Sequence, residues 1–435
     1  MLTASSDEKN TAAVPQNVAL CPDTSDLLSV CGLHRRTHQD LDSKMLRRVQ
    51  EFAHAAWPGA KKGRSPVANP VQVSRSRLQY LRKEPYVCAE KTDGIAMVLV
   101  WAHFHGWGPC AYFMNRAMEV TVVNTVAAAS LFQGEGTVLE GELVLKHSGA
   151  VHFLVYDGIR VCGEDLTSSN YLARRSAVRA VLETPDAPVV QNVPVLLKNA
   201  YMMSEFPKLL QACEAGLGHE SDGLVFTPIN CKVMSGSHPY LLKYKHAPSI
   251  DLWVCFNPDT KQFEFQAGDH DPFEVTEGAS TPGLRERTGG LGFAVDHTTR
   301  LQLETCLTWR LVEFDVTGER WSSQALAQRK PWMRAAAPAV LDPNDPCGRP
   351  GSAARASCMR FCLQFLRERH DKKTANSLYT ALSVLDEVAE SVQVADISDI
   401  AEKLASGACQ RALGLERDVL RITHKKKKKK SHLIS

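Results

Sequence analysis

Between residues 86 and 248 the chain is dominated by short runs of β-branched and aromatic residues, and this pattern restricts it to a fold built on sheets. The clearest runs, which alternate apolar and polar residues or form short buried stretches, lie at 86–90, 95–101, 138–145 and 151–156. Segments with helical spacing of their apolar residues lie at 44–57, 168–182 and 204–215. Strands and helices mixed in this way predict an α+β domain over residues 44–248.

A second region begins after Pro248, where the composition changes. Residues 251–315 contain short strand-like runs broken by Gly- and Pro-rich turns, as in a small β-barrel. The proline-rich stretch 317–357 is interpreted as an insertion, and a helix is expected at 374–392. We therefore expect a barrel domain over residues 249–395, with a further short helix that begins at Asp396 or Asp399.

The two ends of the chain differ from these domains. Residues 1–43 are polar, lack lasting periodicity and are expected to be disordered. Residues 396–435 are expected to form a helix and a tail that contains six consecutive lysines, Lys425–Lys430. Without this run the formal net charge changes from +3 to −3. A generally basic surface for duplex nucleic acid is therefore not supported, and a polyanion would have to bind in a local groove.

Composition also indicates the cellular compartment. The polar N-terminus and the lack of about 18 uninterrupted apolar residues predict a soluble, intracellular protein without a signal peptide or contact with membranes. The 13 cysteines are scattered singly, which is typical of a reducing compartment. Four of the histidines are expected to have ordinary surface or core roles; these are His103, His105, His219 and His238.

The strongest local signal is a lysine at the end of a predicted strand. Lys91 follows the apolar run at 86–90 and leads into Thr92, Asp93 and Gly94 before the next strand begins. A short motif of this kind also occurs by chance in surface turns. A lysine that leaves a buried strand into a glycine-containing turn is nevertheless expected at the floor of a pocket.

Three further strands carry charged residues in a regular pattern. Glu140 and Glu142 alternate on one strand and should share a face, and so should Lys243 and Lys245 on another. Asp222 precedes a third apolar strand. Taken alone, each of these charged residues could simply belong to a salt bridge at the rim of the protein surface, as such residues usually do. Together with the strand-end lysine, they supply a nucleophile, carboxylates for a divalent metal and two cations for a polyphosphate.

This ordered set resembles the covalent nucleotidyltransferase superfamily, which contains polynucleotide ligases and the GTP:RNA guanylyltransferases of mRNA capping. The resemblance spans roughly residues 57–392 and includes the segments EKTDG, FMNR, LEGELV, SDGLVFTP and LLKYK. The capping branch is favoured by the approach PVQVSRSRLQYL to the lysine and by RERHDK at residues 367–372, with Asn376 following. The resemblance implies a ligase-like nucleotidyltransferase domain followed by an OB-fold.

The resemblance further implies a reaction in two steps. Lys91 would attack the α-phosphate of GTP, release pyrophosphate and carry GMP as a phosphoramidate. The 5′-diphosphate end of RNA would then take the GMP, which forms the GpppN cap. Glu142 and Asp222 match metal-site and ribose-side acids for a divalent cation, Mg²⁺ or Mn²⁺.

The same resemblance assigns nucleotide-binding roles to further residues. Arg116 matches a ribose contact, Tyr156 an aromatic residue that stacks on guanine, and Lys198 a lysine that reads the purine edge. Lys243 and Lys245 would hold the α-phosphate. Asp93 and Gly94 of the lysine motif are also carried over as nucleotide-binding residues. The segment RERHDK contributes three more, Arg369, Asp371 and Lys372. Of these, Arg369 and Lys372 would reach the β- and γ-phosphates when the domains close.

Two alternatives stay open at the level of sequence. One is an ATP-dependent polynucleotide ligase of the same superfamily, and the other is a noncatalytic nucleotide- or RNA-binding capping scaffold. The scaffold is favoured only by Ala96, which stands where the superfamily usually has arginine. An RNA triphosphatase and a cap methyltransferase are expected as separate proteins, and the lysine-rich tail favours the nucleus.

Overall fold

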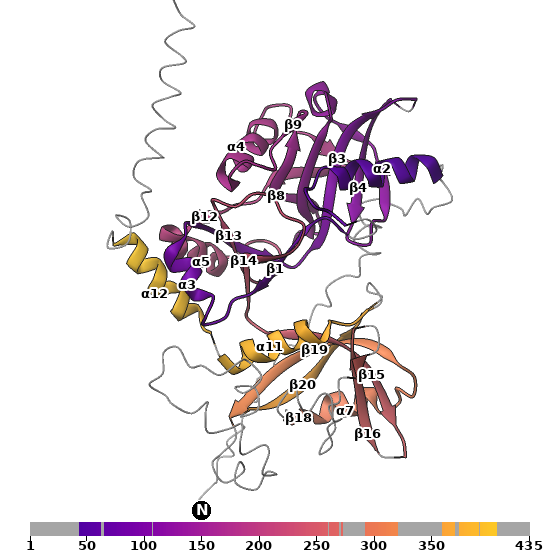
Figure 1. Ribbon diagram of the computed structural model, residues 1–435, viewed down its shortest axis with the longest axis vertical. Helices are drawn as coiled ribbons and strands as arrows, with labels where there is room; N and C mark the ends of the chain where they lie inside the picture. The colour runs from indigo at the N-terminus through magenta and orange to yellow at the C-terminus, as the bar shows by residue number, and fades with distance from the viewer. Residues whose placement is uncertain are drawn as a thin grey trace, which may run out of the picture.

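The computed structural model describes residues 43–61, 65–106, 108–259, 261–268, 271–272, 292–320, 359–369, 374–390 and 392–406. The predictions for residues 1–42, for most of the 317–357 insertion and for the lysine-rich tail lie outside these residues. Within them the chain forms three sheets and seven α-helices (Figure 1). This mixed architecture is the α+β class expected from the sequence.

The first sheet has five strands, in the order β1-β14-β13-β2-β12. Its strands are β1 (Ala68–Gln72), β2 (Tyr86–Thr92), β12 (Tyr201–Met202), β13 (Ser221–Pro228) and β14 (Gly236–Lys245). One face packs against α3 (Leu78–Lys83), α5 (Phe206–Ala215), the 3₁₀ turn η2 (Met203–Glu205) and α12 (Val394–Ala405). The buried core between them includes Leu224, Leu242, Phe206 and Ile397.

The second sheet has nine strands, with β5-β4-β3-β7-β8-β11-β10-β6 as its main path and β9 paired to β8. Its strands are β3 (Ile95–Phe104), β4 (Gly108–Asn115), β5 (Val120–Val123), β6 (Thr125–Val126), β7 (Thr137–Leu145), β8 (Val151–Val161), β9 (Glu164–Asp165), β10 (Val189–Val190) and β11 (Val193–Leu197). The 3₁₀ turn η1 (Ala129–Phe132) packs beside β3.

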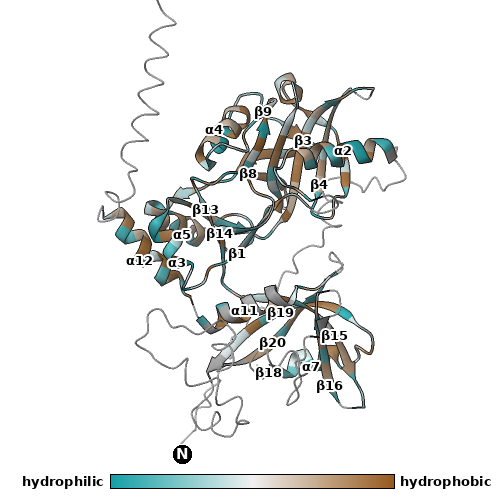
Figure 2. Ribbon diagram, in the orientation of Figure 1, coloured by the Kyte–Doolittle hydropathy of each residue, from teal (hydrophilic) through white to brown (hydrophobic). Residues whose placement is uncertain are grey.

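Strand β3 is buried on both faces, which explains its unbroken apolar sequence. Leu99 and Trp101 belong to the core shared with α4 (Tyr171–Leu182), whereas Val98 and Val100 belong to the core under α2 (Ser43–Ala55). In Figure 2 hydrophobic residues accordingly run along the strands of this sheet, while α2 and α12 carry both hydrophobic and hydrophilic residues. The two helices are amphipathic and each covers one sheet.

The third sheet forms a separate domain, with six strands in the order β17-β16-β15-β19-β20-β18. Its strands are β15 (Ser249–Asn257), β16 (Gln262–Ala267), β17 (Asp271–Pro272), β18 (Gly292–Val295), β19 (Arg310–Arg320) and β20 (Met359–Glu368). Helices α7 (His297–Leu303) and α11 (Leu378–Glu390) pack against its core. The sheet matches the expected barrel region in extent, and its identity as an OB-fold stays a prediction.

Helix α12 begins at Val394, two residues before the earlier of the predicted starts. Asp396 is not its first residue but lies at its third position, where its carboxylate accepts a hydrogen bond from the backbone N–H of Gln393. The helix then packs against α3, α5 and η2, which cover the first sheet, rather than on the barrel domain that precedes it in the chain (Figure 1). No helix within the described ranges is long and apolar enough to cross a bilayer.

Candidate active site

The predicted lysine motif forms the connection between two sheets. Strand β2 of the first sheet ends at Thr92, and β3 of the second sheet begins at Ile95. Gly94 is required at this crossover, because a Cβ there would lie 2.6 Å from the backbone oxygen of Leu143 in β7. Asp93 fixes the other side of the turn, where its backbone N–H donates to the oxygen of Glu220 at 3.1 Å. The turn therefore holds Lys91 where the two sheets meet.

Lys91 and Asp222 form an ion pair. The Nζ atom of Lys91 lies 2.6 Å from Oδ1 of Asp222, and Nζ of Lys245 lies 3.3 Å from Oδ2 of the same carboxylate. Asp222 is an extra residue in the pairing of β13 with β2, where Ser221 is opposite Thr92 and Gly223 is opposite Lys91. The bulge directs the carboxylate between the two lysines.

Lys243 completes a cluster of three lysines. It lies two residues before Lys245 on β14, and its pKa is lowered to about 8 by burial and by the positive charges of Lys245 and Lys91. The negative charge of Glu387, on α11 of the third-sheet domain, opposes this shift. Positive potential is thus concentrated beside the strand-end lysine, as an incoming polyphosphate requires.

The second sheet contributes an aromatic residue and an acid to the opposite side. Tyr156 is an extra residue in the pairing of β8 with β7, because Glu140 is opposite Asp157 and Gly141 is opposite Val155. Burial, together with the charges of Glu140 and Glu142, raises the pKa of the Tyr156 hydroxyl. The two acids of β7 have different partners: Glu140 accepts a hydrogen bond from Nε1 of Trp57 at 2.9 Å, whereas Glu142 lies 3.7 Å from Nζ of Lys198.

Arg116 lies at the exposed edge of this region, just beyond the end of β4. Its Nη1 donates to Oδ1 of Asn69 at 3.0 Å. Its positive charge lowers the pKa of Lys243 and opposes the rise in the pKa of Tyr156. An arginine at this position can contact a ligand that spans the gap between the ring and the lysines.

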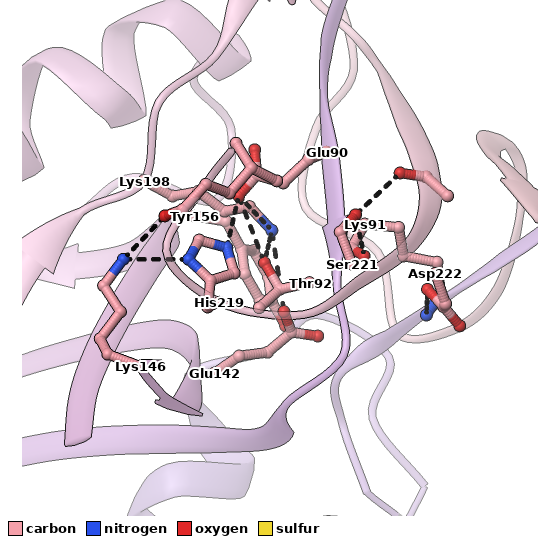
Figure 3. A network of polar contacts seen from close by, with 12 residues as sticks. Glu90, Lys91, Thr92, Glu142, Lys146, Tyr156, Lys198, His219, Ser221 and Asp222 are labelled. Carbon is pink, nitrogen blue, oxygen red and sulfur yellow. Dashed lines mark hydrogen bonds and ion pairs between the residues drawn. The ribbon is translucent and has the colours of Figure 1, made fainter. Parts of the chain in front are cut away.

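Lys198 lies in a buried polar cluster close to the same crossover (Figure 3). Its side chain is 6% exposed, and its Nζ donates to the hydroxyl of Thr92. The ammonium also lies 3.5 Å from Oε1 of Glu90 and 3.7 Å from Oε2 of Glu142. Burial would raise the pKa of Glu90, but the nearby imidazole of His219 and the charge of Lys198 outweigh it and hold this pKa below its ordinary value.

The predicted metal ligands lie in different parts of the site. In Figure 3 Asp222 is beside Lys91, whereas Glu142 is beside Lys198. Among the described residues, no group of three or more His, Cys, Asp or Glu side chains is arranged to hold a metal ion. Magnesium is commonly held by one or two carboxylates together with substrate phosphates, so the carboxylates of Asp222 and Glu142 suit a metal that arrives with a nucleotide.

Arg369 lies apart from these residues, in the third-sheet domain. Its Nη1 donates to Asp251 at 2.8 Å and to Glu313 at 2.9 Å, and its side chain is 9% exposed. Burial would raise the pKa of Glu313, but the charges of Arg369 and Arg367 hold it at about 2. In this conformation Arg369 stabilises its own domain, and its predicted contact with phosphates stays a prediction. Asp371 and Lys372 lie outside the described residues.

The structure thus brings together most of the residues singled out in the sequence. Lys91, Asp222 and Lys245 are in direct contact, and Lys198 is in contact with Glu142. Sequence reasoning missed the participation of Glu90, of Lys146 and of His219, which had been expected to have an ordinary role. The only available signal was that Glu90 directly precedes the motif lysine.

Comparisons with known proteins show which proteins this chain resembles. A family model described as "mRNA capping enzyme, catalytic domain" matches residues 29–247. The chain is 25% identical over 246 residues to a protein of Neurospora crassa named mRNA-capping enzyme subunit alpha, a match that covers 50% of this chain and 60% of that protein. A protein of Schizosaccharomyces pombe with the same name is 24% identical over 382 residues, which cover 80% and 83% of the two chains. Among solved structures, a mycobacterial DNA ligase D with bound ATP matches with a TM-score of 0.33 and 14% identity, over 60% of this chain and 91% of that one.

Proposed function

Because this chain belongs to the family of mRNA capping enzymes, whose catalytic domain matches half of its length, we propose that it transfers GMP from GTP to RNA through a covalent intermediate on Lys91. It is a nucleotidyltransferase, and the acceptor is the 5′-diphosphate end of RNA. The observation that carries the proposal is the position of Lys91, in contact with Asp222 and next to two further lysines on β14.

In the first step the Nζ atom of Lys91 attacks the α-phosphorus of GTP. A P–N bond forms, the bond from the α-phosphorus to the bridging oxygen breaks, and pyrophosphate leaves with that oxygen. The attacking amine must lose a proton. Asp222 Oδ1, at 2.6 Å, is positioned to accept it. Lys243 and Lys245 stabilise the charge that builds up on the α-phosphate.

In the second step an oxygen of the terminal phosphate of RNA attacks the same phosphorus. The P–N bond breaks, Lys91 recovers its amine, and the GpppN end leaves the enzyme. A divalent cation held by Asp222 and Glu142 would supply charge neutralisation on the phosphates when it is bound. The lysine cluster performs part of the same task with residues of the chain itself.

Guanine selection is assigned to Lys198, with Tyr156 as the stacking surface. An ammonium group has three donors and no acceptor. It therefore suits the O6 oxygen of guanine and is mismatched with the 6-amino group of adenine. Buried donors of this kind reject the wrong base strongly, because the site's own polar groups are left unpaired.

The remaining assignments extend the proposal to the whole protein. The third-sheet domain is proposed to be an OB-fold that closes over the nucleotide, with Arg369, Asp371 and Lys372 near the β- and γ-phosphates. The lysine-rich tail supports a nuclear location. The relatives are named subunit alpha, which supports separate proteins for the triphosphatase and methyltransferase steps.

Adduct formation with GTP or ATP labelled at the α-phosphate tests the proposal. We expect a stable GMP adduct with GTP alone, located on Lys91 by mass spectrometry and absent in Lys91→Ala. Lys83→Ala is a matched control. Lys83 is the last residue of α3, and its ammonium donates an exposed hydrogen bond to Gln79 within the same helix. An adduct with ATP alone would establish the ligase alternative. No adduct with either nucleotide would establish the scaffold.

A further inference from the structure

A series of polar contacts connects Lys198 through Glu90 and His219 to Lys146 (Figure 3). Nζ of Lys146, just beyond β7, lies 3.0 Å from Nδ1 of His219. Nε2 of His219 lies 3.5 Å from Oε1 of Glu90, and that oxygen lies 3.5 Å from Nζ of Lys198. The three inner residues, His219, Glu90 and Lys198, are 8%, 4% and 6% exposed.

The contact between Lys146 and His219 determines which imidazole nitrogen of His219 carries the proton. A lysine ammonium can only donate, so Nδ1 of His219 must accept and the imidazole proton must be on Nε2. That Nε2 atom lies at ion-pair distance from the carboxylate of Glu90, and it makes no hydrogen bond with the described residues. Lys146 is itself held by the backbone oxygen of Leu217 at 3.1 Å. Lys146 therefore fixes the imidazole so that its Nε2 side is turned toward Glu90.

Glu90 in turn holds the residues that face the nucleotide. It accepts from the hydroxyl of Thr92 at 3.3 Å, and this hydroxyl accepts from Nζ of Lys198. The backbone of Lys198 is fixed separately, because its N–H donates to Val155 at 2.8 Å and its oxygen accepts from Arg175 at 2.6 Å. The end of the long lysine side chain is thus the part whose position depends on Glu90.

Packing alone does not hold these groups in place. Glu90, Lys146, Lys198 and His219 line one side of a pocket of about 440 Å³. Glu90 and Lys198 could move into this space or bind water there if their partners were removed. Lys198 also has a competing carboxylate, Glu142, at 3.7 Å. On the side away from Thr92 and Lys198, Glu90 is restrained by His219, which Lys146 holds in turn.

We propose that Lys146 and His219 are positioning residues for purine selection: they fix Glu90, and Glu90 holds the Lys198 ammonium where it donates to O6 of guanine. This inference rests on the proposed function, in which Lys198 reads the purine edge. Neither Lys146 nor His219 touches the nucleotide in this scheme. Their removal should therefore alter discrimination between bases more than the chemical step.

The test measures adduct formation with α-labelled GTP and with ATP on the full-length protein. His219→Ala and Lys146→Met should lower the preference for GTP over ATP by roughly 10- to 100-fold, the range expected for loss of one hydrogen bond to a charged group. The change should come mainly from a higher half-saturating GTP concentration, with the maximal rate nearly unchanged. His219→Gln should recover most of the preference, because its amide can still donate toward Glu90.

His147→Ala is the matched control, since it removes an exposed histidine–carboxylate contact with Glu220 at 3.1 Å and should leave the preference unchanged. A purely structural role would lower the rate with both nucleotides equally, so an unchanged GTP-to-ATP ratio in His219→Ala and Lys146→Met would overturn the inference. If thermal unfolding shows that His219→Ala does not fold, Lys146→Met decides alone. Absence of any GMP adduct on the unaltered protein would overturn the proposed function itself, whereas a normal adduct with unchanged variant ratios would overturn only the positioning role.

Discussion

Replacement of Arg369 by alanine should destabilise the third-sheet domain. In the structure this guanidinium lies between Asp251 and Glu313, whose side chains are 5% and 10% exposed. Asp251 also accepts a hydrogen bond from Asn376, and Glu313 also pairs with Arg367, so both carboxylates have partners on more than one side. Arg369→Ala would remove one charged partner from each of these two buried carboxylates.

The size of the effect follows from the pKa of Glu313. A carboxyl group whose pKa is held at about 2 instead of 4.5 has gained roughly 3 kcal/mol of interaction in its charged form, at 1.36 kcal/mol per pKa unit. Removal of one partner from a buried pair commonly costs about 3–5 kcal/mol. We therefore expect a loss of about 3 kcal/mol at neutral pH. Because the folded pKa is depressed, this stabilisation exists above pH 4.5 and is lost as the pH falls through about 2.

Hydrogen exchange in β15 and β19 reports the stability of this domain separately from the rest of the chain. In urea unfolding at several pH values, we expect the difference in the free energy of unfolding between Arg369→Ala and the unaltered protein to become smaller as the pH falls. Arg310→Ala is the matched control, because Arg310 of β19 forms a more exposed pair with Glu368 of β20 at 2.7 Å in the same domain and should have little effect. The reasoning would be refuted if Arg369→Ala were no more destabilising than Arg310→Ala, or if acidification left the difference unchanged.

Three further changes test other parts of the site. Gly94→Ala brings a Cβ to 2.6 Å from the oxygen of Leu143, so the turn must move, and we expect single-turnover adduct formation to fall roughly a hundredfold; a normal rate would show that the crossover tolerates displacement. Ala96→Arg places a cation opposite Glu142 in the pairing of β3 with β7, and the half-saturating GTP concentration should fall by about one to two decades; an unchanged value would show that Arg116 already supplies this contact. Burial, and then the charge of Asp157, raises the pKa of Glu140 to about 8. The stability that its protonated form contributes is therefore lost as the pH rises from 4.5 through about 8. In urea unfolding, Glu140→Gln should lose less stability over this range than the unaltered protein, and an equal loss in both proteins would contradict the prediction.

Features that depend on local periodicity could be predicted from the sequence. The strands β2, β3, β7 and β8 begin within one residue of the predicted runs, because alternation and β-branched residues reflect burial directly. Lys91, Asp222 and Lys245 could be singled out because each is a charged residue at or near the end of an apolar strand, and Glu142 because it alternates with Glu140 within one.

Features that depend on long-range pairing could not be predicted. The bulges at Tyr156 and Asp222 arise from the register of two strands, which no single strand's sequence contains. His219 contacts Lys146 across 73 residues of chain, so its polar surroundings become visible only in the folded protein. The sequence predicted a short helix from Asp396 or Asp399 but could not indicate that α12 would join the core of the first sheet.

The position of α12 also affects how this protein can fold during synthesis. The core of the first sheet includes Ile397, Ile400 and Leu404, which leave the ribosome after every strand of that sheet and after the entire third-sheet domain. Synthesis from Lys245 to Leu404 takes on the order of ten seconds at ordinary elongation rates, and during that time the core under α3, α5 and η2 lacks the apolar face of α12. The third-sheet domain can close its own core before the first sheet can. The part of the chain that is made first is therefore completed last, and nascent chains halted in this interval should be the ones that most need chaperones.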